Sequence, residues 1–321
     1  IQAGTHNVAI GRDALRLGSN NNVTENVVVG SYSLNQLTNA YKNVVIGYNC
    51  SGSGTMTGGN TWHSNVVIGY QAGNIVPSTA SNIIIGKYTC GNAGSSQSNN
   101  IVMGEYAGQY LGNSSNNCII MGQQAAQYAG NGSGSNLAYS WVHSIAIGYR
   151  AFRNATGAPD AVVAIGPNAL REHNGDGDGS SGGYICAMGQ SALAACEHMR
   201  HSVAVGNDAG AYWNPAKGNQ HEGGAVFIGG GAGRYQGTAT ALVAVGRDAL
   251  NSSSSSPASG SNNTAIGARC LEKLTSGSHN VCVSALYGAL FVDTGSWNTF
   301  MGSLAGYGYD TNNSCKSGNY C

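Results

Sequence analysis

The sequence has little charge, few prolines and no long apolar run. Only 9% of the 321 residues are charged, and 14 basic residues balance 14 acidic ones, so the formal net charge is zero. Nucleic acids and anionic membrane surfaces attract basic proteins, and this chain has no excess of positive charge to offer them. No apolar run approaches the roughly 20 residues of a membrane-spanning helix. We therefore predict no nucleic acid and no membrane among its partners.

Several common patterns are also missing. The Gly at every third position of collagen is absent, and an apolar content of 41% is high enough for the chain to fold around a core. No segment keeps a helical period, and none of the nine cysteines belongs to a C-x-x-C pair of the kind that binds zinc. The start carries no secretion signal, and because it begins with Ile1 we expect a processed or partial chain. We predict no metal and no cofactor.

Glycine is abundant instead, and it marks a repeat. Each copy has three mostly β-branched residues, then Gly, two variable residues and a small residue, as in "VVIGYQA" at 66–72. Sixteen copies place this Gly, once replaced by Ser, at positions 11, 30, 47, 69, 86, 104, 122, 148, 166, 189, 206, 229, 246, 267, 284 and 302. Short β-branched runs in such a series predict stacked strands. The predicted fold is all-β, a parallel β-solenoid or β-roll of about 16 repeats of 17–26 residues at 1–306, with a Gly/Asn/Ser-rich tail at 307–321.

Two positions of the repeat have predicted structural roles. The Gly supplies a positive φ or room for close backbone approach at a corner, for example at Gly11, Gly69, Gly148 and Gly267. An Asn stands four residues before the Gly in nine copies, where its side chain can hydrogen-bond from one turn to the next. These residues are Asn7, Asn26, Asn43, Asn65, Asn82, Asn100, Asn263, Asn280 and Asn298.

The strands and their spacing suggest further features. Adjacent residues such as Ile83, Ile84 and Ile85 are all apolar, so we expect both faces of the sheet to be covered, one by the core and one by another chain. Every second interval between Gly positions is 17 or 18 residues, and the longer intervals fall between these. The alternation is explained either by crowding of loops on consecutive turns or by two repeats in each turn.

A third regularity concerns the residue four positions after the Gly. Where it is Leu, as at Leu15 and Leu250, no Tyr follows, and where it is Gly or Ala, a Tyr often follows two residues later, as at Tyr110 and Tyr212. We expect this Tyr to fill the core volume that the missing Leu leaves.

Four copies of the repeat resemble sequences of known families: "NVAIGRDAL", "NVVIGYQAG", "SVAVGNDAG" and "NTAIGARCL". They resemble the head repeats of trimeric autotransporter adhesins. They are more similar to the longer Ala-Ile-Gly-Tyr-x-Ala-Leu repeats of bacteriophage tail fibres and of surface glycoproteins of some large algal viruses. The resemblance covers residues 7 to about 306. It implies a parallel β-roll or β-solenoid, usually a homotrimer, on a virion or cell surface, and it brings no catalytic residues with it.

Candidate ligand-binding residues lie in the long intervals. They are Trp62 and His63, Trp141 and His143, and Trp213 with His221 and Glu222. A Trp beside polar groups can stack on a sugar or anchor a protein, whereas the alternative is that each Trp packs on the neighbouring turn. Cys315 and Cys321 in the tail are a candidate disulfide.

These patterns predict a non-enzymatic structural protein. The preferred hypothesis is a tail fibre or adhesin, a viral structural protein for host attachment on a virion or in the extracellular space. Its expected partners are two further copies of the chain, other virion or fibre subunits, and a host-surface glycan or protein receptor. The alternatives are a purely structural extracellular filament subunit and a tail-spike polysaccharide depolymerase, for which no carboxylate pair can be identified.

Overall fold

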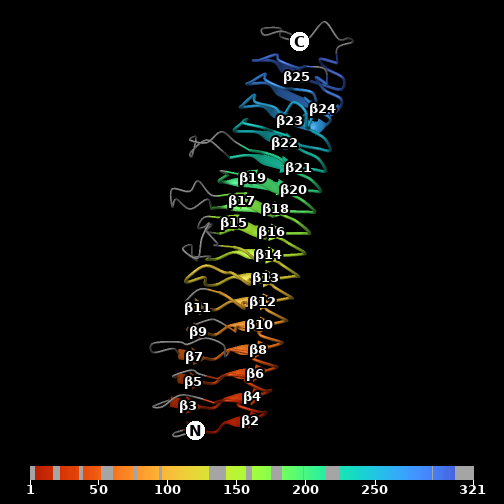
Figure 1. The fold of residues 1–321 in the computed structure, drawn as a ribbon. Coiled ribbons are helices and arrows are strands. Elements are labelled where there is room, and N and C mark those ends of the chain that lie inside the picture. Colours follow the sequence, from red (N-terminus) through yellow and green to blue (C-terminus); the bar gives the residue numbers. More distant parts are fainter. Residues whose placement is uncertain are drawn as a thin grey trace. The chain divides into compact units, whose positions relative to one another are not determined.

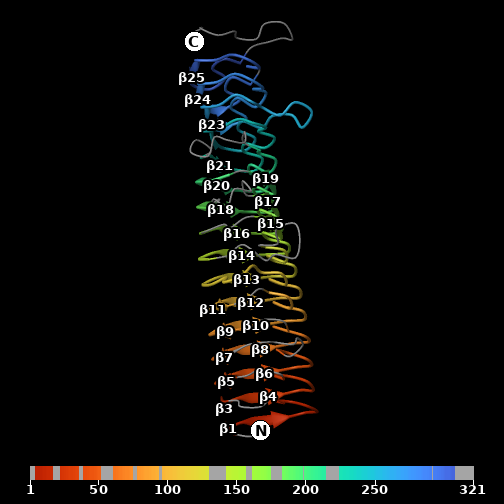
Figure 2. The same cartoon turned by 60° about the vertical axis from the view of Figure 1, so that its left-hand side comes forward.

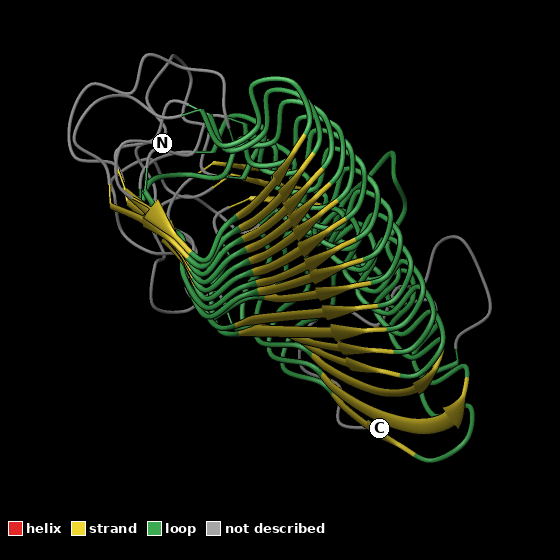
Figure 3. Ribbon diagram, turned by 90° about the horizontal axis from the view of Figure 1, so that it is seen from below, coloured by secondary structure: helices red, strands yellow, loops and turns green. Residues whose placement is uncertain are grey.

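The computed structural model describes residues 4–16, 22–35, 39–51, 61–74, 78–93, 96–129, 142–156, 161–174, 183–197, 199–214, 224–290 and 292–307. The chain forms two compact units, residues 1–161 and 162–321. Across the described ranges every regular element is a strand and none is a helix (Figure 3). The prediction of an all-β chain is confirmed.

The first unit is built on one long parallel sheet. Its strands lie in chain order (Figure 1) and are β2 (Val8–Ile10), β4 (Val27–Val29), β6 (Val44–Ile46), β8 (Val66–Ile68), β10 (Ile83–Ile85), β12 (Ile101–Met103), β13 (Ile119–Met121) and β14 (Ile145–Ile147). Val44 pairs with Val27 on one side and with Val66 on the other, so corresponding residues of successive repeats face each other. Each repeat is therefore one turn of a parallel β-solenoid, and the alternative of two repeats in each turn is wrong.

The second unit has the same organisation. Its long parallel sheet contains β16 (Val163–Ile165), β18 (Ile185–Met188), β20 (Ser202–Val205), β21 (Val226–Ile228), β22 (Val243–Val245), β23 (Thr264–Ala268), β24 (Val281–Leu286) and β25 (Thr299–Met301). Strands β23 and β24 are longer than the others and contain a register shift between Ile266 and Ala268. This irregularity coincides with the one repeat in which Ser284 replaces the Gly.

A shorter sheet precedes the long one in the turns of the first unit that contain β2 to β12. Its parallel strands are β1 (Gly4–Thr5), β3 (Asn22–Thr24), β5 (Asn39–Tyr41), β7 (Thr61–His63), β9 (Thr79–Ala80) and β11 (Gln97–Ser98). Figures 1 and 2 show β3, β5 and β7 beside β4, β6 and β8. This unit also contains β15 (Asn154–Thr156), and in the second unit β17 (Glu172–Asn174) pairs in parallel with β19 (Ala195–Glu197).

From β4 onward, the residue two positions before the repeat Gly, or before Ser284, points into the core. In β8, Val67 is fully buried while Val66 and Ile68 are half-buried on the outer face. The same alternation recurs in both units, since successive side chains of a strand point to opposite faces. These side chains form one column of the core, which also contains the middle residues of the shorter sheet, such as Val23. The outer face of the long sheet remains apolar and partly exposed in one chain.

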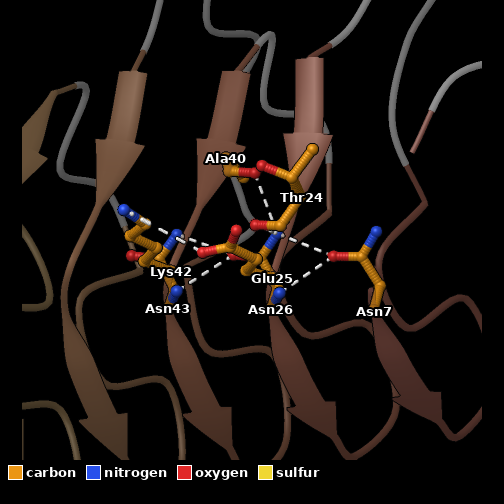
Figure 4. Close-up of polar contacts among 7 residues, drawn as sticks. All are labelled: Asn7, Thr24, Glu25, Asn26, Ala40, Lys42 and Asn43. Atoms are coloured by element: carbon orange, nitrogen blue, oxygen red, sulfur yellow. Dashed lines mark hydrogen bonds and ion pairs between the residues drawn. The ribbon is translucent and has the colours of Figure 1, made fainter. Parts of the chain in front are cut away.

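The regular spacing of the asparagines corresponds to a ladder of hydrogen bonds in two runs, from Asn7 to Asn100 and from Asn263 to Asn298, and Figure 4 shows the start of the first run. Oδ1 of Asn7 accepts from the backbone N–H of Asn26 at 2.9 Å and from its Nδ2 at 3.0 Å, and Oδ1 of Asn26 accepts in the same way from Asn43. The predicted contact between turns is confirmed. The other links of the ladder join Asn43 to Asn65, Asn65 to Asn82, Asn82 to Asn100, Asn263 to Asn280 and Asn280 to Asn298.

The repeat Gly turns the corner at the end of each long-sheet strand. Gly11, Gly69, Gly148 and Gly267 have φ values of +127°, +147°, +132° and +123°, a region that residues with a Cβ rarely adopt. The backbone of the next turn also lies close, since a Cβ at Gly11 would lie 2.7 Å from the carbonyl carbon of Gly30. Both predicted reasons for Gly are confirmed.

The prediction that Tyr replaces a missing core Leu is wrong. Tyr110 and Tyr212 lie outside the core, each stacked on the Tyr of the next turn at 5.2 and 4.9 Å. The residue four positions after the repeat Gly has a left-handed backbone, with φ 54° at Leu15. A Gly at this position relieves the backbone strain but leaves the volume of the Leu side chain empty in the core. Other side chains fill it: at Gly108 it is Leu111, whose Cδ1 would lie 2.9 Å from an added Cβ.

Candidate functional site

Two of the three candidate tryptophans belong to the core. Trp62 and Trp213 are both 0% exposed, so the prediction that they present a ring to a ligand is wrong. Trp62 can be buried because Gly73 of the same turn has no side chain: a Cβ at Gly73 would lie 3.1 Å from Cη2 of the indole. Trp213 packs edge-to-face on Phe227, with ring centroids 5.4 Å apart. Both rings are core residues, and Trp213 packs on the neighbouring turn as the alternative hypothesis states.

The remaining candidates are divided between the surface and the undescribed part of the chain. His63 is half-buried and stacks on Tyr41 at 4.9 Å, with ring planes 3° apart. His143 is exposed at a corner, with φ 52°, and its N–H donates to the carbonyl of Asn116 at 3.2 Å. The other predicted residues lie outside the described residues: Trp141, His221, Glu222, Cys315 and Cys321. Of the predicted groups only Trp62 and His63 are described in full, and they do not form one exposed site, because the Trp62 ring is buried.

The burial of Trp213 leads to a stability prediction. Its Nε1–H donates to the carbonyl oxygen of Ala239 at 2.7 Å within the core. Trp213→Phe removes the donor and part of the ring, which leaves a buried acceptor unpaired and a small void. We expect a loss of about 2 kcal/mol in local stability, measured by amide hydrogen exchange around Phe227. Unchanged exchange in that variant would contradict the packing described here.

Trp297 is the most exposed tryptophan of the described residues and is not among the predicted site residues. Its side chain is 68% exposed and stacks on His279 with centroids 3.9 Å apart and planes at 7°. His279 Nε2 lies 3.4 Å from Nδ2 of Asn262 in the preceding turn. Its exposure could have been predicted from its position in the repeat, because Trp297 directly precedes the ladder residue Asn298.

The outer face of the long sheet is the second candidate surface. The residues one and three positions before the repeat Gly, or before Ser284, form two apolar rows in each unit, and many of them are more than a third exposed. In the first unit they include Val8, Ile10, Val27, Ile46, Ile83 and Met121, and in the second Met188, Val203, Val205, Ile228, Ile266, Val281, Val283 and Met301. Contiguous apolar patches of this kind are typical of interaction surfaces.

Cysteines of the described residues are mainly small core residues. Burial raises the pKa of the Cys90 thiol to about 12, and burial also raises the pKa of Cys50. Since the thiolate is the reactive form, we expect both to resist Ellman's reagent at pH 8 until the chain is unfolded. Cys186 lies half-buried on the outer face, so in a monomer it should react before Cys50 and Cys90. Peptide mass spectrometry after labelling checks this order, and fast native labelling of Cys90 would contradict it.

Comparisons with known proteins do not assign the chain to a family. Within the described ranges, no three His, Cys, Asp or Glu side chains come together as metal ligands. The described elements also include no helix that is long and apolar enough to cross a membrane. No family model, no curated protein and no solved structure matches the chain.

Proposed function

We propose that this chain is a structural fibre or adhesin subunit, displayed on a virion or in the extracellular space, that assembles as a homotrimer and attaches to a host surface. The observation that carries the proposal is the repeated turn with an apolar outer face in both units. A stack of near-identical turns provides length and rigidity without a catalytic centre. The resemblance of the repeats to tail-fibre and adhesin-head sequences supports the same function.

The homotrimer is proposed to form through the outer face of the long sheet. Its apolar rows repeat at the strand spacing of about 4.8 Å, and only a surface with the same repeat can interlock along their length. A second copy of this chain has that repeat. Zero net charge also means that copies do not repel each other.

Light scattering tests the assembly directly. A homotrimer has a mass of about 98 kDa, three times the 32.7 kDa of one chain. Ile46→Lys combined with Ile228→Lys places a charge on the outer face of each unit and should yield monomers with unchanged circular dichroism. The control is Ser64→Lys, at an exposed corner where another turn carries Lys42 with the same left-handed backbone. A monomeric wild type would contradict the proposal.

Host attachment is proposed to use a glycan or a protein receptor, bound by loops inserted between repeats. A glycan array and a host-cell binding assay test it with the full chain. Trp141→Ala and His143→Ala, and separately His221→Ala with Glu222→Ala, should weaken binding at least tenfold if the inserted loops carry the receptor site. Wild-type chains that bind neither glycans nor host cells would contradict an adhesin.

The second candidate function is that of an extracellular filament subunit without a receptor. The burial of Trp62 and Trp213 favours it, because two presumed contact residues have structural roles instead. Assembly without any binding in these assays would support this function. We propose no enzymatic activity, and release of reducing sugars from host polysaccharide would contradict that part of the proposal.

A further inference from the structure

Two cysteines of the second unit meet in the core at the boundary between two turns. Cys270 and Cys282 belong to consecutive turns, and both side chains are 0% exposed. Both are thiols in the structure, and the thiol of Cys282 donates a hydrogen bond to the sulfur of Cys270. Sγ of Cys270 also lies 3.7 Å from the carbonyl oxygen of Ser284, which belongs to the turn of Cys282. The two sulfur atoms are therefore in contact across the boundary.

The backbone places Cys270 beside a glycine of the next turn, Gly288. The N–H of Leu250 donates to the carbonyl of Cys270 at 3.0 Å, and the N–H of Leu271 donates in the same way to the carbonyl of Gly288 at 3.0 Å. Cys270 is the third residue after its repeat Gly, whereas Gly288 is the fourth after Ser284, and the register shift between β23 and β24 accounts for the extra residue. Cys270 and Gly288 thus occupy the same position in consecutive turns.

The absence of a side chain at Gly288 makes room for the sulfur of Cys282. This position is Ala in most turns, but a Cβ at Gly288 would lie 2.5 Å from Sγ of Cys282 and 2.5 Å from Cβ of Ser284. Ala265, which pairs with Cys282 in the preceding turn, shows that the position of Cys282 accepts a smaller side chain. The Cys282 sulfur therefore takes the place that a methyl group holds in other turns, next to Cys270.

The boundary that the two cysteines span is irregular. Ser284 stands where the other fifteen repeats have Gly, and the pairing of β23 with β24 shifts register between Ile266 and Ala268. In a solenoid each turn is held by its two neighbours, so the stability of the stack depends on every boundary between turns. A covalent bond between the turns at this boundary would offset the irregular pairing.

We propose that Cys270 and Cys282 form a disulfide bond that joins these two turns. The thiolate of Cys270 attacks a small disulfide such as oxidised glutathione, which releases one molecule of reduced thiol and leaves a mixed disulfide on Cys270. The thiolate of Cys282 then attacks the Cys270 sulfur, and the second molecule of reduced thiol leaves. The two cysteines lose two electrons and two protons in total, and the small disulfide takes up both as two thiols.

The chemistry of the pair fits this order of steps. The hydrogen bond from the Cys282 thiol lowers the pKa of Cys270, which favours Cys270 as the attacking thiolate. Because both sulfur atoms are buried, we expect the exchange to occur before this part of the core closes during folding. The inference rests on the proposed extracellular or virion setting only for its oxidant, since such settings are oxidising.

Peptide mapping tests the bond in the full chain. One sample is folded with reduced and oxidised glutathione and another with dithiothreitol, and free thiols are then blocked with N-ethylmaleimide in denaturant. Trypsin cuts after Lys273, between Cys270 and Cys282, and chymotrypsin cuts after Tyr287, between Cys282 and Cys315. We expect mass spectrometry of the oxidised sample to find a peptide pair linked through Cys270 and Cys282, which separates on reduction.

Amide hydrogen exchange measures what the bond does for the fold. Exchange in β23 and β24 should be at least about tenfold slower in the oxidised wild type than in the reduced wild type. Cys270→Ala introduces the most frequent residue of its position, and it should remove both the linked peptides and the difference in exchange. The matched control is Cys50→Ala, because Cys50 is buried at the same position of a turn in the first unit, and it should preserve both.

The outcomes separate the bond from the wider function. N-ethylmaleimide on both Cys270 and Cys282 after oxidative folding would overturn the proposal, and so would linkage of either residue to Cys315 or Cys321. Linked peptides with unchanged hydrogen exchange would overturn the role of the bond in holding the turns together. If Cys270→Ala does not fold, the comparison of oxidised with reduced wild type decides. The glycan and host-cell assays test attachment independently, so either proposal can fail while the other stands.

Discussion

Gly104→Ala is expected to disrupt the solenoid locally and severely. Gly104 has φ +133°, and a Cβ there would lie 2.5 Å from the carbonyl oxygen of Gly122 and 2.7 Å from its carbonyl carbon. The neighbouring atoms belong to backbone that is fixed by the parallel ladder of the next turn, so they cannot move aside. Left-handed strain and steric overlap together should cost about 4 kcal/mol. The measurement is amide hydrogen exchange of the strands on either side, β12 and β13.

Gly302→Ala separates the two contributions. Gly302 occupies the same position of the repeat with φ +113°, but no described atom lies within 4 Å of the Cβ it would gain. The control should therefore show only the conformational strain, about 1–3 kcal/mol. Equal losses in the two variants would mean that close packing of turns contributes nothing, which would contradict the role assigned to the repeat Gly.

The fold was predictable because its determinants are local and repeated. The left-handed Gly and the hydrogen-bonding Asn act through the backbone of the turn that carries them and of the turn directly beside it. The regular spacing of these residues in the sequence is therefore enough to predict a stack of turns. The number of repeats in each turn was not determined by spacing alone, because both alternatives place long loops at every second interval. The pairing of Val44 with Val66, one repeat apart, decides between them.

The candidate site was predicted poorly because the burial or exposure of an aromatic ring depends on its position in the turn and on its neighbours. Trp62 stands three residues before Asn65 and is the buried middle residue of β7, where it packs against Gly73. Trp297 stands one residue before Asn298, at a corner that is exposed in turn after turn. Interval length does not distinguish these two positions. The number of residues between each Trp and the ladder Asn that follows it does distinguish them, and this number can be read from the sequence.

Asn65→Asp is expected to break the ladder in a manner that depends on pH. Nδ2 of Asn65 donates to Oδ1 of Asn43 at 3.0 Å and to the carbonyl of Thr79 at 3.1 Å, in the core. A carboxylate there would face two acceptors without water, which raises the pKa of the new carboxyl in the folded state. In the unfolded chain it ionises near its ordinary pKa of about 3.9. The folded chain retains the proton that the unfolded chain releases, so stability falls as pH rises above that value.

The expected cost is about 1 kcal/mol at pH 3.5, for one lost hydrogen bond, and about 4 kcal/mol at pH 7. Hydrogen exchange of the N–H of Asn82, which donates to Oδ1 of Asn65 at 3.0 Å, measures it at both pH values relative to wild type. Asn99→Asp is the matched control, because Asn99 is exposed at a corner of the same unit with a left-handed backbone and should change little at either pH. Asn65→Ser should be milder at pH 7, since Ser144 and Ser202 occupy the equivalent position elsewhere. A loss of stability that is independent of pH would show that the ladder stabilises the fold through packing alone. A loss that grows with pH would show that the buried amide donors stabilise it.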